Sequence, residues 1–121
     1  MISNQTFLAV FLGSKNSRRW KAWEALSEPE RGARARDGMA AWHAWAEKHK
    51  NDIVTMGGPL GKTKKVSEGG IEDVSNAFGA FTIVTAASHE AAAKLFEGHP
   101  HFAIFPGDCV EIMPVLPVPG A

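Results

Sequence analysis

Two histidines separated by one residue, His99 and His101, are the strongest chemical feature of this sequence. In an extended segment, residues two apart project to the same side, so the two imidazoles can act as a binding pair or as acid/base groups near neutral pH. Asp73 and Asp108 are carboxylates that could orient a histidine in such chemistry. These four residues are the candidate catalytic residues. The alternative, which the pattern favours, is that one histidine caps the preceding helix or hydrogen-bonds the turn.

A metal site is not expected from this histidine pair. Zinc would need at least one more close ligand, and no cysteine pair supplies a structural site because Cys109 is the only cysteine. A lone cysteine inside an apolar run is typical of a reduced, buried thiol, which suits the cytoplasm. We therefore expect no metal and no cofactor.

A glycine-rich segment at residues 57–63 ends in Lys-Thr and resembles a phosphate-binding loop. The spacing argues against that function, because a P-loop has glycine five positions before Gly61, where this chain has Met56, and it leads into a helix. We expect a tight turn between two strands instead. Lys62 and Lys64 from this segment are candidate ligand-binding residues for the carboxylate or phenolate of a small substrate.

Four tryptophans form two pairs at i, i+3 spacing, Trp20 with Trp23 and Trp42 with Trp45. Residues three apart lie on one face of a helix, so each pair predicts an aromatic stripe. Such stripes are usually part of a core. The functional alternative is an aromatic wall around a planar substrate, for which Trp42 and Trp45 are the candidate ligand-binding residues.

The composition limits the partners of the protein. The 13 Lys and Arg residues balance 13 Asp and Glu residues, so no overall field attracts nucleic acid or an anionic membrane surface. No segment approaches the roughly 20 apolar residues of a membrane span, and the first residues do not resemble a signal peptide. We expect a soluble cytoplasmic protein whose residues 1–121 form a single domain.

The elements that position these residues alternate between strands and helices. Short apolar runs predict strands at 6–12, 53–56, 80–86 and 109–115, with a further strand beginning near Lys64. Capping serines followed by helical spacing predict helices after Ser17, Ser27 and Ser88. This order indicates a ferredoxin-like α+β fold, in which one antiparallel sheet carries helices on one face.

The second of these helices contains two glycines in its first half, Gly32 and Gly38. Each glycine weakens a helix by about 1 kcal/mol relative to alanine. We therefore expect this helix to break or bend in its first half.

The first predicted strand is apolar at every position from Phe7 to Leu12. A sheet covered on one face should alternate apolar and polar residues, so the second face of this strand must also be covered. No helix remains in the sequence for that purpose. We infer that the sheet of a second copy packs there, forming a homodimer with two-fold symmetry. The alternative is an apolar ligand pocket on that face, and the two can coexist.

With these elements placed, the chain resembles the YCII-related family of the dimeric α/β barrel superfamily. The resemblance covers nearly the whole length and rests on the apolar first strand, the long helix, and residues 53–60 (IVTMGGPL), 78–84 (FGAFTIV), 88–92 (SHEAA) and 99–100 (HP) leading to 110–115 (VEIMPV). It implies two ferredoxin-like protomers whose sheets form a shared barrel.

The resemblance carries over no catalytic residue. Some relatives have a His and Asp pair proposed for acid/base or lyase-like chemistry, with the histidine near the start of the long helix. Here the corresponding stretch, about residues 31–40, contains Asp37 but no histidine, and His43 is about a turn later. The Asp-Gly-Pro-Phe motif of another branch is replaced by residues 72–77 (EDVSNA).

Together these observations predict a cytoplasmic, dimeric, cofactor-free protein with a pocket for a small organic molecule between sheet and helices. As an enzyme it would use lyase-like or isomerase-like acid/base chemistry. One of the two histidines would be the acid/base group, one of the two aspartates its orienting partner, and one of the two lysines the anion anchor. The alternative is a non-catalytic ligand-binding or accessory dimeric domain whose aromatic residues hold a ligand.

Overall fold

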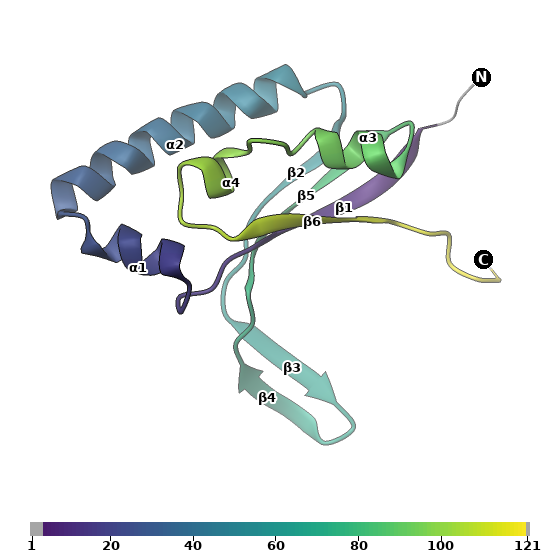
Figure 1. The fold of residues 1–121 in the computed structure, drawn as a ribbon. Helices are drawn as coiled ribbons and strands as arrows, with labels where there is room; N and C mark the ends of the chain where they lie inside the picture. The colour runs from purple at the N-terminus through teal and green to yellow at the C-terminus, as the bar shows by residue number, and fades with distance from the viewer. Residues whose placement is uncertain (1–3, 121) are drawn as a thin grey trace.

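A four-stranded antiparallel sheet with helices on one face forms the body of the molecule in the computed structural model, which describes residues 4–120 (Figure 1). The sheet order is β2-β5-β1-β6, and every neighbouring pair is antiparallel. The strands are β1 (Gln5–Leu12), β2 (Ile53–Pro59), β5 (Phe78–Ala86) and β6 (Cys109–Pro114). With two helical crossovers, this order confirms the predicted ferredoxin-like α+β fold.

The helices begin at the serines that the sequence predicts as caps. Helix α1 (Arg18–Ala25) follows Ser17, and α2 (Glu28–Lys48) follows Ser27 in a complete capping box with Glu30. Helix α3 (His89–Lys94) follows Ser88. A fourth helix, α4 (Pro100–Ala103), lies in a segment that the sequence prediction treated as a turn.

Helix α2 runs without interruption through both of its glycines, so the expected break does not occur. Gly38 is buried, and a Cβ atom at this position would lie 2.5 Å from Cε2 of Phe105. At Gly32 the nearest such neighbour is a guanidinium nitrogen of Arg36, at 3.7 Å. Gly38 therefore allows the Phe105 ring to pack directly on the helix backbone.

Strand β2 continues past the predicted end at Met56. Gly57 has a φ of +67°, a conformation that side chains rarely adopt, and a Cβ atom there would overlap the carbonyl group of Phe81 on β5. The glycine pair thus continues the sheet instead of ending it.

A separate hairpin of β3 (Thr63–Ser67) and β4 (Gly70–Val74) projects from the body of the molecule (Figure 1). The second of these strands was not predicted, because residues 70–74 carry two acidic side chains and no alternating apolar pattern. The hairpin places Lys64 opposite Asp73 and Val66 opposite Ile71.

The core lies between the sheet and the helices. It contains alternate residues of β1 and β5 with apolar side chains from α2, α3 and the segment after α3: Phe7, Ala9, Phe11, Trp45, Val84, Ala86, Ala92 and Phe96. The intervening β1 residues Leu8, Val10 and Leu12 face the other side of the sheet and remain half-buried. No helix within residues 4–120 covers that side (Figure 1).

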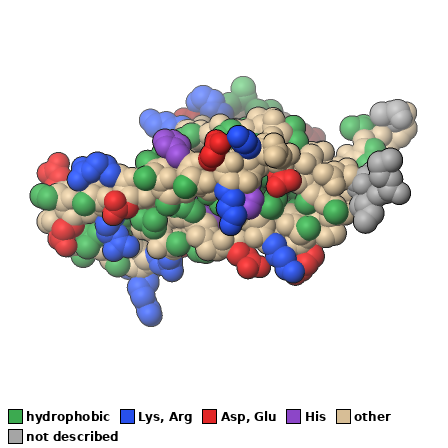
Figure 2. Space-filling model, turned by 90° about the horizontal axis from the view of Figure 1, so that it is seen from above, with side chains coloured by type: hydrophobic (Ala, Val, Ile, Leu, Met, Phe, Trp, Pro, Cys, Tyr) green, Lys and Arg blue, Asp and Glu red, His purple; other side chains and the backbone are tan. Residues whose placement is uncertain are grey.

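Basic and acidic side chains are both present on the helix side of the molecule (Figure 2). This distribution agrees with the formal net charge of zero. None of the helices in the described part of the chain has the length and apolar character needed to cross a membrane.

The two α2 glycines predict opposite effects of the same substitution. Gly32→Ala should raise the free energy of unfolding by about 0.5–1 kcal/mol, because the helix gains propensity and the new methyl group has space. Gly38→Ala should lower it by about 1–3 kcal/mol, because the methyl group displaces Phe105. Urea unfolding of both variants measures the difference. Equal stabilisation by both would contradict the close packing at Gly38.

Candidate functional site

His99 is fully buried inside a group of aromatic rings. The ring centroids of Trp42, Trp45 and Phe11 lie 4.5, 4.7 and 5.0 Å from its own. His99 is the N-cap of α4, where its Nδ1 accepts a hydrogen bond of 3.0 Å from the backbone N–H of His101. The first of the two predicted histidines therefore holds the turn that positions the second.

The same surroundings keep His99 neutral at pH 7. Burial is the main influence that lowers the pKa of His99 to about 4, and the neighbouring His101 and His49 act in the same direction. Because Nδ1 accepts a hydrogen bond, the neutral ring carries its proton on Nε2. That Nε2 is the only buried side-chain nitrogen or oxygen without a hydrogen-bond partner among residues 4–120.

His101 lies half-buried beside the end of β1, 89 residues away in sequence. Its Nε2 donates a hydrogen bond of 2.8 Å to the carbonyl oxygen of Leu12, which also accepts a bond of 2.9 Å from the backbone N–H of Asp108. A Cβ atom on Gly107 would overlap the His101 ring, so glycine is required for this placement. The ring is thus fixed through Nε2, and Nδ1 is left as its unprotonated acceptor.

Several charges and contacts act on the pKa of His101. Partial burial has the largest influence and lowers this pKa below its usual value, and the positive charge of Arg19 lowers it further. The hydrogen bond to Leu12 and the charge of Asp108 raise it. The net direction is downward, so His101 is a neutral base at pH 7.

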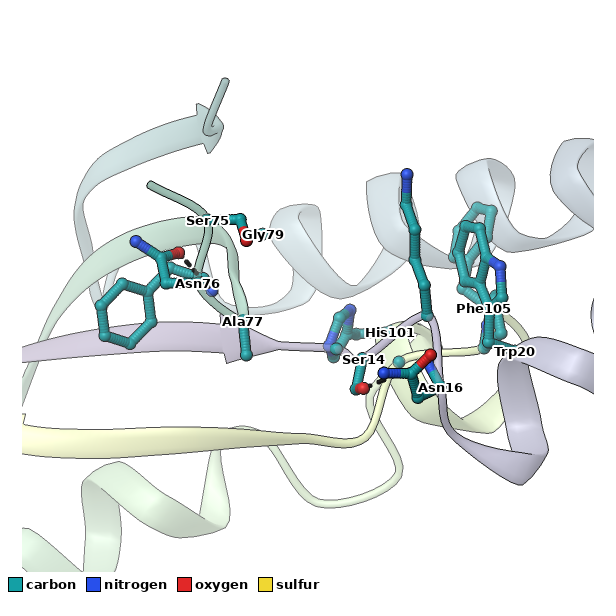
Figure 3. Close-up of a pocket in the computed structure, with 14 residues that line it drawn as sticks. Ser14, Asn16, Trp20, Ser75, Asn76, Ala77, Gly79, His101 and Phe105 are labelled. Carbon is teal, nitrogen blue, oxygen red and sulfur yellow. Dashed lines mark hydrogen bonds between the residues drawn. The ribbon is translucent and has the colours of Figure 1, made fainter. Parts of the chain in front are cut away.

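A surface cavity of about 750 Å³ lies in front of His101 (Figure 3). Its walls come from the loop after β1, the start of α1, the end of the hairpin and the segment after α4. Trp20 and Phe105 line one end of it, and Ser14 and Asn16 are drawn near His101 (Figure 3). Asn76 lines the opposite wall. The cavity therefore combines aromatic surfaces, neutral polar groups, one imidazole and the ammonium group of Lys15, whose Nζ lies 5.9 Å from the centroid of the Trp20 ring.

The predicted carboxylates do not both accompany His101. Asp108 is exposed but close enough for its charge to act on the His101 ring. Asp73 lies on the hairpin, where its carboxylate pairs with Lys64 Nζ at 2.6 Å and is 82% exposed. No carboxylate within residues 4–120 forms a hydrogen bond with His101.

The two predicted lysines belong to a neighbouring cavity of about 560 Å³. Lys62, Lys64 and Asp73 line it, and it shares Asn76 and Phe78 with the His101 cavity. The hairpin therefore brings these charged side chains beside the His101 cavity and not into its lining.

The predicted tryptophans of α2 belong to the core. Trp45 is 8% exposed, and its Nε1 donates a hydrogen bond of 2.7 Å to the Leu95 carbonyl. Trp42 packs on His99 and Phe11. Neither lines the His101 cavity, whose aromatic walls are instead Trp20, Phe78 and Phe105. Only Trp20 was marked by its spacing, because the approach of the other two depends on long-range contacts.

No group of three or more His, Cys, Asp or Glu side chains suited to hold a metal ion exists within residues 4–120.

The chain has a ferredoxin-like α+β fold with a cavity lined by His101, and it shares this fold with a solved enzyme structure. Among solved structures it is similar to 5-chloro-2-hydroxyhydroquinone dehydrochlorinase (TftG) from Burkholderia phenoliruptrix AC1100, in complex with 2,5-dihydroxybenzoquinone. The identity is 20% and the TM-score 0.51, over 89% of this chain and 90% of the other. The likeness shows the fold. The chain matches no family model and no curated protein sequence.

The buried His99 predicts a pH-dependent stability. Below pH 6.5 the unfolded chain takes up a proton on His99, whereas the folded chain does so only near pH 4. The free energy of unfolding should therefore fall as the pH is lowered from 6.5 to 4, by on the order of 3 kcal/mol from this group, and then level off. Urea unfolding across this range measures the effect.

His99→Asn is the matched variant, because asparagine can still cap α4 but does not titrate. Its stability should depend less on pH than that of the wild type in this window. Parallel pH profiles for the two proteins would show that His99 is not the group responsible.

Proposed function

We propose that this protein is a cofactor-free enzyme that transfers a proton on a small, planar organic molecule, with His101 as the acid/base group. The observation that carries the proposal is the placement of this imidazole at the wall of the 750 Å³ cavity. Its Nε2–H is committed to the Leu12 carbonyl, which leaves Nδ1 as the free base.

The chemistry follows from this tautomer. Nδ1 accepts a proton from an acidic C–H or O–H of the substrate, and the electron pair left behind forms a new double bond. In an isomerisation the resulting imidazolium returns the proton to another atom of the same molecule. In an elimination the leaving group departs with its electron pair, and the imidazolium later gives its proton to solvent. Neither course requires a redox partner.

The side chains that line the cavity favour a planar substrate that carries hydroxyl or carbonyl groups. Trp20 and Phe105 offer flat aromatic surfaces, whereas Ser14, Asn16 and Asn76 offer hydrogen bonds to hydroxyl or carbonyl oxygens (Figure 3). The similar structure of the dehydrochlorinase holds 2,5-dihydroxybenzoquinone, a molecule of this kind. Lys62 and Lys64 line the adjoining cavity, and Lys62 is the proposed anchor for a substrate anion because Lys64 is paired with Asp73.

A second function, non-catalytic ligand binding as an accessory or sensing domain, is favoured by one observation. No carboxylate in the described part of the chain hydrogen-bonds to His101, and the ring is oriented by a backbone carbonyl instead. The same cavity could therefore hold a ligand without chemistry.

We further infer that the protein is a cytoplasmic homodimer of single-domain protomers and a member of the YCII-related family. The open face of the sheet supports the dimer. Leu8 on this face pairs with Ile83 of β5 and Met113 of β6, and Val10 pairs with Phe81. On β6 the partner of Val10 is Glu111, so the face is mostly apolar with one acidic side chain. A mostly apolar sheet face is typical of an interface between subunits.

Proton transfer can be measured on 2,5-dihydroxybenzoquinone as the probe, by following exchange of its ring C–H with deuterium in D₂O by NMR. The wild-type protein should accelerate this exchange. His101→Gln should reduce the acceleration by about 100-fold or more, because glutamine can still donate to Leu12 but is not a base.

His43→Gln is the control for that experiment, since His43 is exposed on α2. It should leave the exchange rate unchanged. Binding of the probe without faster exchange would favour the non-catalytic function, and neither binding nor exchange would contradict both.

The proposed dimer predicts that a charged residue on the open sheet face will prevent association of the two subunits. Val10→Asp should convert the dimer to a monomer, because a carboxylate would be buried between the sheets. Val66→Asp, on the exposed hairpin, should leave the dimer intact. Light scattering at about 10 μM measures both, with circular dichroism to check folding. A monomeric wild-type protein at this concentration would refute the proposed interface.

A further inference from the structure

The positive charges of this neutral protein are concentrated in its first half. Residues 1–50 contain nine Lys and Arg but five Asp and Glu, whereas residues 51–121 contain four and eight. Most of the basic residues lie on α1 and α2, and Figure 2 shows Lys and Arg side chains, together with Asp and Glu side chains, around the end of the molecule where these helices lie. This end can therefore attract a small anion although the whole chain has no net charge.

A cavity of about 260 Å³ lies where α1, α2 and the segment after α4 meet. Arg19 from α1 and Arg34 from α2 both line it. The rest of the lining is apolar and includes Trp23 and Phe105, whose ring centroids are 5.9 Å apart. No carboxylate belongs to the lining, so two guanidinium groups share a largely apolar cavity without a balancing charge.

The two arginines differ from Arg31, which lies between them in sequence order. Arg31 is occupied by hydrogen bonds to the carbonyl oxygens of Glu24 and Leu26. Arg19 donates to the Phe102 carbonyl, which fixes its guanidinium group and leaves further N–H donors. Arg34 forms no hydrogen bond and no ion pair with any residue of the described part of the chain.

The charge of Arg19 is also not cancelled by a neighbour. It acts on His101, whose pKa it lowers, and Phe105 lines both this cavity and the His101 cavity. Arg19 forms no ion pair with a carboxylate within residues 4–120. The two cavities are thus neighbours that share Phe105 and Pro106 in their linings.

We propose that the cavity between α1 and α2 binds a small organic carboxylate, with the carboxylate held by Arg19 and Arg34 and an aromatic body against Trp23 and Phe105. Guanidinium groups bind carboxylates through paired charge-assisted hydrogen bonds, and they also stack on planar groups. This binding site is independent of the acid/base function of His101.

Benzoate is the probe for this site, and benzamide is its neutral counterpart of the same shape. Titration calorimetry should show saturable binding of benzoate with a dissociation constant on the order of 1 mM. Benzamide should bind at least about tenfold more weakly, because it lacks the charge that the arginines recognise.

Substitutions on α2 test whether benzoate binds in this cavity or to basic side chains elsewhere on the surface. Arg34→Gln should weaken benzoate binding by about tenfold or more. Arg34→Glu should abolish it and raise the melting temperature, because the new carboxylate can pair with Arg19. Arg36→Gln is the matched control, since Arg36 is exposed on the same helix and does not line the cavity. It should leave binding unchanged.

Three results would overturn the proposal: no saturable binding of benzoate up to about 20 mM, benzamide binding as tight as benzoate binding, or equal losses in the Arg34→Gln and Arg36→Gln variants. His101→Gln should retain benzoate binding. If His101 proves not to catalyse proton transfer, the proposal of this binding site is unaffected. If benzoate does not bind, the proposed chemistry of His101 is unaffected.

Discussion

The carbonyl oxygen of Leu12, at the end of the first strand, is the point on which the site depends. It accepts hydrogen bonds from Nε2 of His101 and from the backbone N–H of Asp108. The first bond holds the imidazole, and the second begins the pairing of β1 with β6. One backbone group therefore couples the last strand of the sheet to the orientation of the candidate base. It also selects the tautomer, because a carbonyl oxygen can only accept a hydrogen bond.

The position of His101 also depends on a buried polar side chain, that of His99. His99 caps α4 with Nδ1, but its Nε2 has no hydrogen-bond partner and lies among aromatic rings. A buried polar group without a partner is costly, so the core gives up some stability at this position. The turn that His99 caps places His101 between the core and the cavity, because the His101 ring packs against the buried Phe11 and also lines the cavity. Gly38 contributes in the same way, since it allows Phe105 to pack on α2 and form a shared wall.

The chemistry that follows is simpler than a histidine and carboxylate dyad. His101 is oriented by a backbone carbonyl and influenced by Asp108 only through charge. Partial burial and Arg19 keep the ring neutral, which suits a base that accepts a proton and later releases it. Arg19, which lowers the pKa of this ring, also lines the neighbouring cavity, where we propose that it holds an anion together with Arg34. The acid/base group and the anion-binding groups thus lie close together but in different spaces.

Local patterns in the sequence determined the secondary structure well. The apolar runs at 6–12, 80–86 and 109–115 are strands, and Ser17, Ser27 and Ser88 begin helices, because strand and helix periods and capping depend on residues only a few positions apart. From this pattern and the strand order, the ferredoxin-like fold could be predicted. The roles of the chemically active residues could not.

The tertiary structure decided which of the two histidines is buried and which one faces a cavity. It also paired Asp73 with Lys64 on a hairpin that has no apolar pattern. The physical reason is distance along the chain. His101 is fixed by a carbonyl group 89 residues earlier, and its cavity is closed by loops from four separate segments. Contacts between residues so far apart in sequence depend on how the sheet and the helices pack, and the local spacing of residues does not predict them.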